Sequence, residues 1–210
     1  LGATPFEDRT DAGRKLGERL IDQGMEADIV LAIPRGGLPL GRTVADALGV
    51  PLDIVVAKKM GAPSNEELAI GAVAADGSVW VNDDLMRSHT VSQSYIDRVR
   101  EQEARNAREK AARYREEPPS LAGKRVVIVD DGVATGATAR ACIEQVRSQN
   151  ADRIILAIPV GPPDRIDELR AAADDVVCLV TPTRFRAVGQ FYESFDQVSD
   201  EEAMAYLDGE

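Results

Sequence analysis

The sequence is short of several residue types, and each shortage excludes a class of protein. Its two cysteines, Cys142 and Cys178, are too few and too far apart to frame a disulfide scaffold or a cysteine metal site. No apolar run reaches the roughly 18 residues of a membrane span. The chain also does not open with the charged-then-apolar pattern of a secretion signal. These absences predict a cytoplasmic protein that keeps its thiols reduced.

Positive charge is also scarce. Acidic residues outnumber basic ones by 36 to 25, and the formal net charge is -11. Binding to nucleic acid or to an anionic membrane needs a basic surface, so we expect neither partner. Only five cations are lysines, and two of them, Lys58 and Lys59, are adjacent. This acidic, lysine-poor composition fits both a protein adapted to high salt and a biased genome, and the sequence leaves both open.

Aromatic residues make up only 4% of a chain that is 44% hydrophobic. Aliphatic side chains and alanine must therefore fill most of the core, which suits a parallel sheet that is buried on both faces. The length of 210 residues is that of one ordinary domain. We expect a single domain over residues 1–210.

Short β-branched runs alternate with helical patterns along the chain, as is typical of an α/β fold with a mainly parallel sheet. The five runs that predict strands are residues 27–34, 51–59, 124–131, 153–160 and 175–182. The predicted helices between them are residues 11–23, 38–48, 138–149 and 164–173. The sequence thus predicts an open five-stranded sheet flanked by helices.

The middle of the chain departs from this alternation. Residues 69–81 contain two short strand-like pieces joined through Asp76-Gly77, a hairpin signal, so we expect a small antiparallel annex. Residues 92–117 are densely charged and predict a solvated helix, which Pro118-Pro119 ends.

The sequence VVIVDDGVATGAT, residues 126–138, carries the strongest functional signal. A buried strand delivers Asp130 and Asp131 to its carboxyl end, where open α/β sheets bind ligands. Residues 132–138 then open a helix, whose free N–H groups and dipole favour a phosphate, and Thr135 and Thr138 add hydroxyl donors. Acids beside a phosphate site fit a ribose 5-phosphate, whose 2′ and 3′ hydroxyls can donate to the carboxylates. A Walker loop is excluded because Ala137 follows Gly136.

This motif resembles the phosphoribosyl pyrophosphate motif of type I phosphoribosyltransferases. The resemblance implies that family's fold, including a hood over the site. It assigns ribose 5-phosphate to a set of motif residues: Asp130, Asp131, Ala134, Thr135, Gly136, Ala137 and Thr138. It also implies Mg²⁺, held with the help of Asp130 and Asp131 directly or through water.

Two further segments resemble the pyrophosphate half of such a site. IPRGGLPLG, residues 33–41, follows a strand, and it places Arg35, Gly36 and Gly37 where the family has its pyrophosphate loop, often with an unusual peptide bond. AKKMGAPSNEELAIG, residues 57–71, resembles the mobile catalytic loop, although Ala57 stands where related enzymes commonly have Arg. Lys58 and Lys59 are both candidates for catalysis and pyrophosphate binding, and strand alternation should turn one of them toward the site.

The acceptor is the least determined part of the sequence. We expect the hood to come from residues 183–210 together with N-terminal residues such as 5–9, and we take Val133, Phe185 and Phe191 as candidates for contact with a base. Aromatic side chains are more often core than stacking platforms, so both roles stay open for the two phenylalanines. Family frequency mildly favours a purine.

The resemblance implies that a nitrogen nucleophile displaces pyrophosphate from C1 of the sugar, through a transition state with oxocarbenium character. The cations would neutralise the leaving group, the acids would hold the ribose, and closure of residues 60–68 would exclude water. We expect a homodimer active in nucleotide salvage. A regulator that binds phosphoribosyl pyrophosphate without turning it over is the alternative.

Overall fold

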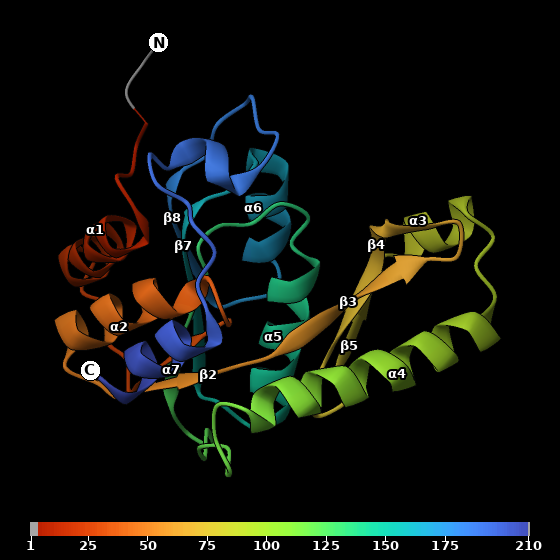
Figure 1. The fold of residues 1–210 in the computed structure, drawn as a ribbon, viewed down its shortest axis with the longest axis horizontal. Helices are drawn as coiled ribbons and strands as arrows, with labels where there is room; N and C mark the ends of the chain where they lie inside the picture. Colours follow the sequence, from red (N-terminus) through yellow and green to blue (C-terminus); the bar gives the residue numbers. More distant parts are fainter. Residues whose placement is uncertain (1–3, 210) are drawn as a thin grey trace.

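The computed structural model of the protein describes residues 4–209, apart from the side chain of Glu67. Residues 1–3 and 210 of the predicted domain lie outside this part. The chain forms an α/β fold with a five-stranded parallel sheet and a separate three-stranded antiparallel sheet (Figure 1). Both sheets were predicted, and the fold class is confirmed.

The parallel sheet has the strand order β2-β1-β6-β7-β8. All its neighbouring strands run parallel. Its strands are β1 (Ile29–Ala32), β2 (Leu52–Ile54), β6 (Arg125–Val129), β7 (Arg153–Val160) and β8 (Asp175–Val180). The central strands β1, β6 and β7 are buried on both faces, as their β-branched runs predicted.

Helices cover both faces of this sheet. Helices α1 (Arg9–Asp22) and α2 (Gly37–Leu48) pack on one face through Leu16, Leu20 and Val44. Helices α5 (Ala137–Ser148) and α6 (Pro163–Arg170) pack on the other through Ile143 and Leu169. All four were expected, and each begins within two residues of the predicted position.

The run at residues 51–59, predicted as one strand, is divided between the two sheets. Strand β2 ends at Ile54, and the chain then leaves β1 to begin β3 (Ala57–Ala62) in the antiparallel sheet. Val55 still donates to the carbonyl of Ala32 on β1, whereas Val56 already accepts from Ala75 beyond the end of β4. The prediction was wrong here because continuous apolar character does not reveal a change of pairing partner.

The antiparallel annex consists of β3, β4 (Asn65–Ala74) and β5 (Val79–Val81) in that order. The turn between β4 and β5 contains Asp76-Gly77 as predicted, and Asp76 accepts from the backbone of Ser78. Residues 57–71, compared above with a mobile loop, form most of the β3–β4 hairpin. Their alternate residues Met60, Ala62 and Ile70 are buried in one small cluster.

Helix α4 (Gln93–Ala112) is the charged helix that the sequence predicted, and it runs along the annex (Figure 1). It is not solvated on every side, because Ala104 and Ala107 are buried. Helices α3 (Asp83–Ser88) and α7 (Asp200–Asp208) and the short 3-10 helix η1 (Val188–Phe191) were not predicted. Ser199 and Glu202 form a capping box at the start of α7, a sequence signal that could have revealed it. None of the helices in residues 4–209 combines the length and the apolar character that a membrane span requires.

Candidate active site

The two glycine-containing motifs meet because their strands are neighbours. Strands β1 and β6 pair in parallel with Ala32 opposite Val129, so the loops that follow them leave the same edge of the sheet. The contact between the loops is close at Gly36, where a Cβ atom would lie 2.1 Å from Oδ2 of Asp131. The peptide bond between Pro34 and Arg35 in this loop is cis. The sequence thus brings the expected pyrophosphate loop against the acid pair.

The acid pair lies at the end of β6 with both side chains half-buried. The backbone N–H of Asp131 donates to Oδ1 of Asp130 at 2.8 Å. Burial raises the pKa of Asp130 well above its usual range, and the adjacent Asp131 carboxylate raises it further. Burial also raises the pKa of Asp131, although Arg9 acts in the opposite direction. The pair therefore resists carrying two negative charges unless a cation joins it.

Arg9, at the start of α1, is an unpredicted partner of the acid pair. Its Nε donates to Oδ2 of Asp131 at 2.9 Å, and the two side chains are only 12% and 16% exposed. The same guanidinium donates to the carbonyl of Asp196 at 2.6 Å and lies 3.8 Å from the ring centroid of Phe195. Arg9 thus fixes one carboxylate and joins it to the C-terminal segment.

The N-terminal and C-terminal segments are also paired directly. The backbone of Phe6 donates to Phe191 and accepts from Glu193. The Tyr192 hydroxyl donates to the carbonyl of Asp131 at 2.6 Å. Residues 6 and 192, remote in sequence, therefore lie together beside the acid pair.

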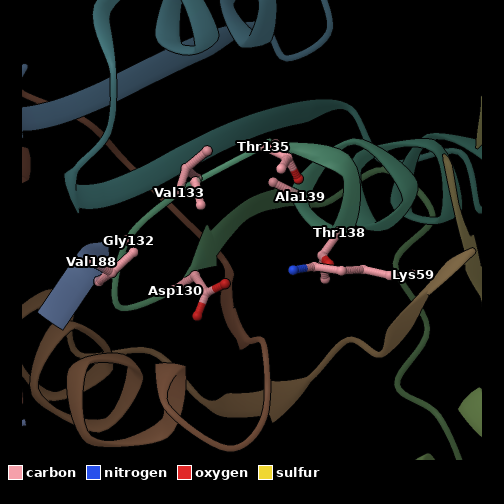
Figure 2. Close-up of a pocket in the computed structure, with 10 residues that line it drawn as sticks. Lys59, Asp130, Gly132, Val133, Thr135, Thr138, Ala139 and Val188 are labelled. Carbon is pink, nitrogen blue, oxygen red and sulfur yellow. The ribbon is translucent and has the colours of Figure 1, made fainter. Parts of the chain in front are cut away.

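A cavity of about 170 Å³ lies next to the loop of residues 132–138, which we call the motif loop. Its floor is the N-terminus of α5, where Gly136 takes a positive φ of 81° that favours glycine. Figure 2 shows Thr135 and Thr138 at the start of α5, where they line the cavity. It also shows Lys59 of β3 extending toward the cavity, and Val188 beside Gly132. The lining residues are Lys59, Asp130, Gly132, Val133, Ala134, Thr135, Gly136, Thr138, Ala139 and Val188. Asp130, residues 132–138 and Lys59 thus share a single cavity.

A second cleft, of about 380 Å³, lies next to Arg35 and holds the other lysine of the pair. Because side chains alternate along β3, Lys58 lines this cleft and Lys59 lines the first. Arg35 lies 3.6 Å from Asp200 of α7, whose Oδ1 also accepts from Tyr114. Lys110 of α4 lines the same cleft and donates to the carbonyl of Pro34 at 2.7 Å.

The expected acceptor residues are only partly gathered at the first cavity. Val133 lines it, whereas Phe191 is buried in the core and Phe185 stacks on Phe191 with ring centroids 5.5 Å apart. Among the described residues that line the cavity, Val188 of η1 takes the place we expected for these rings. No pattern in the sequence had singled it out.

A divalent cation has two carboxylates available at this edge. Within residues 4–209, no group of three or more His, Cys, Asp or Glu side chains is placed to hold a metal. Mg²⁺ is commonly bound by one or two carboxylates together with substrate phosphates and water. Asp130 and Asp131 therefore fit a magnesium ion that arrives with a phosphorylated ligand, and they do not form a complete protein site.

Comparison with known proteins agrees with this geometry. The family model described as the phosphoribosyl transferase domain matches residues 6–195. A Mycobacterium tuberculosis protein named as a candidate phosphoribosyl transferase is 44% identical over 205 residues, which are 97% of this chain and 46% of that protein. The chain thus spans about half the length of this relative.

Solved structures show the same similarity. The crystal structure of the protein TT1426 from Thermus thermophilus is 40% identical, with a TM-score of 0.82 over 96% of this chain and 97% of that one. Purine phosphoribosyltransferase from Pyrococcus horikoshii is 20% identical, with a TM-score of 0.50 over 91% of this chain and 92% of that one, and shares the fold.

Proposed function

The chain belongs to the phosphoribosyl transferase domain family, and we propose that it transfers ribose 5-phosphate from phosphoribosyl pyrophosphate to a nitrogenous base, releasing pyrophosphate. The observation that carries the proposal is the cavity in which Asp130 and the N-terminal loop of α5 share one wall. A ligand that fills it must present a phosphate at one end and hydrogen-bond donors at the other.

The motif loop would hold the 5-phosphate. The first N–H groups of α5 have no carbonyl partners within the helix, and they point to where the phosphate would sit. Thr135 and Thr138 line the same wall and add hydroxyl donors. Asp130 and Asp131 would accept from the ribose 2′ and 3′ hydroxyls, with Arg9 fixing the orientation of Asp131. When bound, Mg²⁺ would neutralise charge on the pyrophosphate, and the same two carboxylates would hold it.

The second cleft suits the leaving group. Arg35 and Lys58 line it, next to the Gly36-Gly37 turn, so pyrophosphate there would lie between cations and open backbone. Stabilising negative charge as it develops on a leaving group lowers the barrier for its departure. We assign Lys58 to pyrophosphate and Lys59, which lines the first cavity, to the ribose-phosphate side. Closure of the β3–β4 hairpin over the ligand remains a prediction.

For the acceptor we propose the space between Val133 and Val188, which give the first cavity an aliphatic wall. Such a wall can contact the face of a planar base without an aromatic stack. We place the hood in residues 183–210 with residues 5–9, since backbone hydrogen bonds join Phe6 to Phe191 and Glu193. We propose a purine as the base.

The test measures pyrophosphate release from Mg²⁺ and phosphoribosyl pyrophosphate with a panel of purine and pyrimidine bases. Base-dependent release supports the transfer reaction. Calorimetry on Asp130→Asn with Asp131→Asn should show loss of Mg²⁺-dependent binding, whereas unchanged binding would refute the assigned site. Tight binding by the wild type without release for any base would instead indicate a regulator.

A further inference from the structure

Helix α4 directs one of its charged residues inward. Ile96, Ala104 and Ala107 are buried on the face that packs against the rest of the protein. Lys110 lies on this face, one turn after Ala107, and is half-buried. The sequence pattern had placed the whole segment in solvent.

The Lys110 ammonium reaches the loop that holds the cis peptide. Its Nζ donates to the carbonyl of Pro34 at 2.7 Å, across 76 residues of sequence. A lysine ammonium has three donors, so two remain for another acceptor. Arg35 follows Pro34 directly, and Lys58 lines the same cleft.

The cleft gathers more positive than negative charge, although the protein as a whole is acidic. Its charged lining is four cations and two acids: Arg35, Lys58, Lys110, Arg113, Glu109 and Asp200. Burial, followed by repulsion from Lys58 and Arg35, lowers the pKa of Lys110, against the attraction of Asp130 and Asp200. Like charges held together in a half-buried cleft are costly unless an anion joins them. The cleft is therefore built to receive a multivalent anion.

We infer that Lys110 binds the pyrophosphate of the donor directly, as a third cation beside Arg35 and Lys58. The inference rests on the proposed function and extends it to a helix outside every motif of the sequence. A diphosphate suits the cleft, because its oxygens can accept from the free Lys110 donors while also reaching Arg35. The 5-phosphate belongs to the loop of α5, so Lys110 should discriminate between ligands with and without pyrophosphate.

The experiment compares wild type with Lys110→Met, which keeps the aliphatic stem and removes the charge. Calorimetry with Mg²⁺ should show binding of phosphoribosyl pyrophosphate weakened about 10- to 100-fold, the range expected for a lost hydrogen bond to a charged group. Binding of ribose 5-phosphate should stay within about twofold, because its phosphate lies elsewhere. Arg105→Met on the exposed face of α4, where Arg105 lies 3.6 Å from Glu101, is the matched control and should leave both ligands unaffected.

A pH profile separates direct contact from a structural role. As the pH rises toward the ordinary lysine pKa of about 10.4, the wild type should progressively lose affinity for phosphoribosyl pyrophosphate, because the lowered pKa of Lys110 lets it deprotonate first, whereas Lys110→Met should lose less. The other charged groups facing Lys110 are Arg35, Lys58, Arg113, Glu109, Asp130 and Asp200. Lys58 is the other lysine that lines the cleft, so Lys58→Met is profiled beside it.

The outcomes are distinct. Equal weakening of both ligands, or wild-type affinity for phosphoribosyl pyrophosphate in Lys110→Met, would overturn the inference and leave the proposed function intact. A wild type that binds no phosphoribosyl pyrophosphate would overturn both. Should Lys110→Met fail to fold, Lys110→Gln supplies the neutral side chain for the same comparison.

Discussion

Replacing Gly36 by alanine should impair the acid pair without straining the backbone. Gly36 has a φ of -59°, which any residue adopts. A Cβ atom there would lie 2.1 Å from Oδ2 and 2.9 Å from Cγ of Asp131, whereas ordinary contact begins at 3.4 Å. The carboxylate must therefore retreat by about 1.3 Å, and it would move away from its position beside Arg9.

The size of the effect follows from that displacement. Misplacing a catalytic group by about 1 Å can cost on the order of 100-fold in rate, which corresponds to roughly 2.7 kcal/mol. We expect Gly36→Ala to lower kcat/KM for pyrophosphate release by about this factor and to weaken Mg²⁺-dependent donor binding. Steady-state kinetics and calorimetry measure the two effects, and melting curves check that the variant is folded.

A double-mutant cycle tests whether the loss acts through Asp131. In an Asp131→Ala background the obstructing carboxylate is gone, so Gly36→Ala should cost little beyond the first substitution. Additive losses would mean that the new methyl group obstructs the ligand itself. Wild-type affinity and turnover in Gly36→Ala would refute the reasoning altogether.

Three further predictions concern the same edge of the sheet. Arg9→Met should lower the melting temperature by about 5 °C, since orphaning a largely buried carboxylate costs roughly 2 kcal/mol in a chain of this length; an unchanged melting temperature would contradict it. The raised pKa of Asp130 means that the folded wild type binds this proton more tightly than the unfolded chain, so the wild type loses stability as the pH rises above about 4. Asp130→Asn has no such proton to lose, so its melting temperature should rise relative to that of the wild type over the same pH range. Melting temperatures that change in parallel with pH would exclude this. Gly136→Ala, at a φ of 81°, should lose about 1 kcal/mol in denaturant unfolding, and Gly136→Asn less; equal losses would argue against backbone strain.

The sequence predicted most of the parallel sheet because its signals are local. The run before Asp130 is apolar and β-branched, and the small residues after it open α5, so the strand, the acids and the proposed phosphate loop could be located within 13 residues. The rule that ligands bind at the carboxyl edge of such a sheet then places Arg35 near the acids. The strand order that makes β1 and β6 neighbours gives this expectation its physical basis.

The residues that sequence reasoning missed reach the site through tertiary contacts. Arg9 meets Asp131 across 122 residues, and Lys110 meets Pro34 across 76. Neither has a flanking motif, since Arg9 was noted only as the last of the N-terminal hood residues 5–9, and Lys110 is one charge among many. Val188 lies in a short 3-10 helix, which leaves no periodic pattern. Such residues are positioned by the packing of whole helices and strands against one another. No short stretch of the sequence reveals that packing.

The charges around the proposed donor site keep weak partners or hydrogen-bonding groups to spare. Arg35 lies 3.6 Å from a half-exposed Asp200, a separation at which an ion pair contributes little. Lys110 donates only one of its three N–H groups to the carbonyl of Pro34. Asp131 accepts from Arg9 through Oδ2, so its other carboxylate oxygen lies outside this contact. A ligand with phosphates and hydroxyls would therefore replace or add to the hydrogen-bond partners of these side chains, and would not have to remove water from unpaired charges. Because the groups are already oriented, little ordering cost remains at binding. An acidic protein can in this way keep a cationic cleft beside an acid pair.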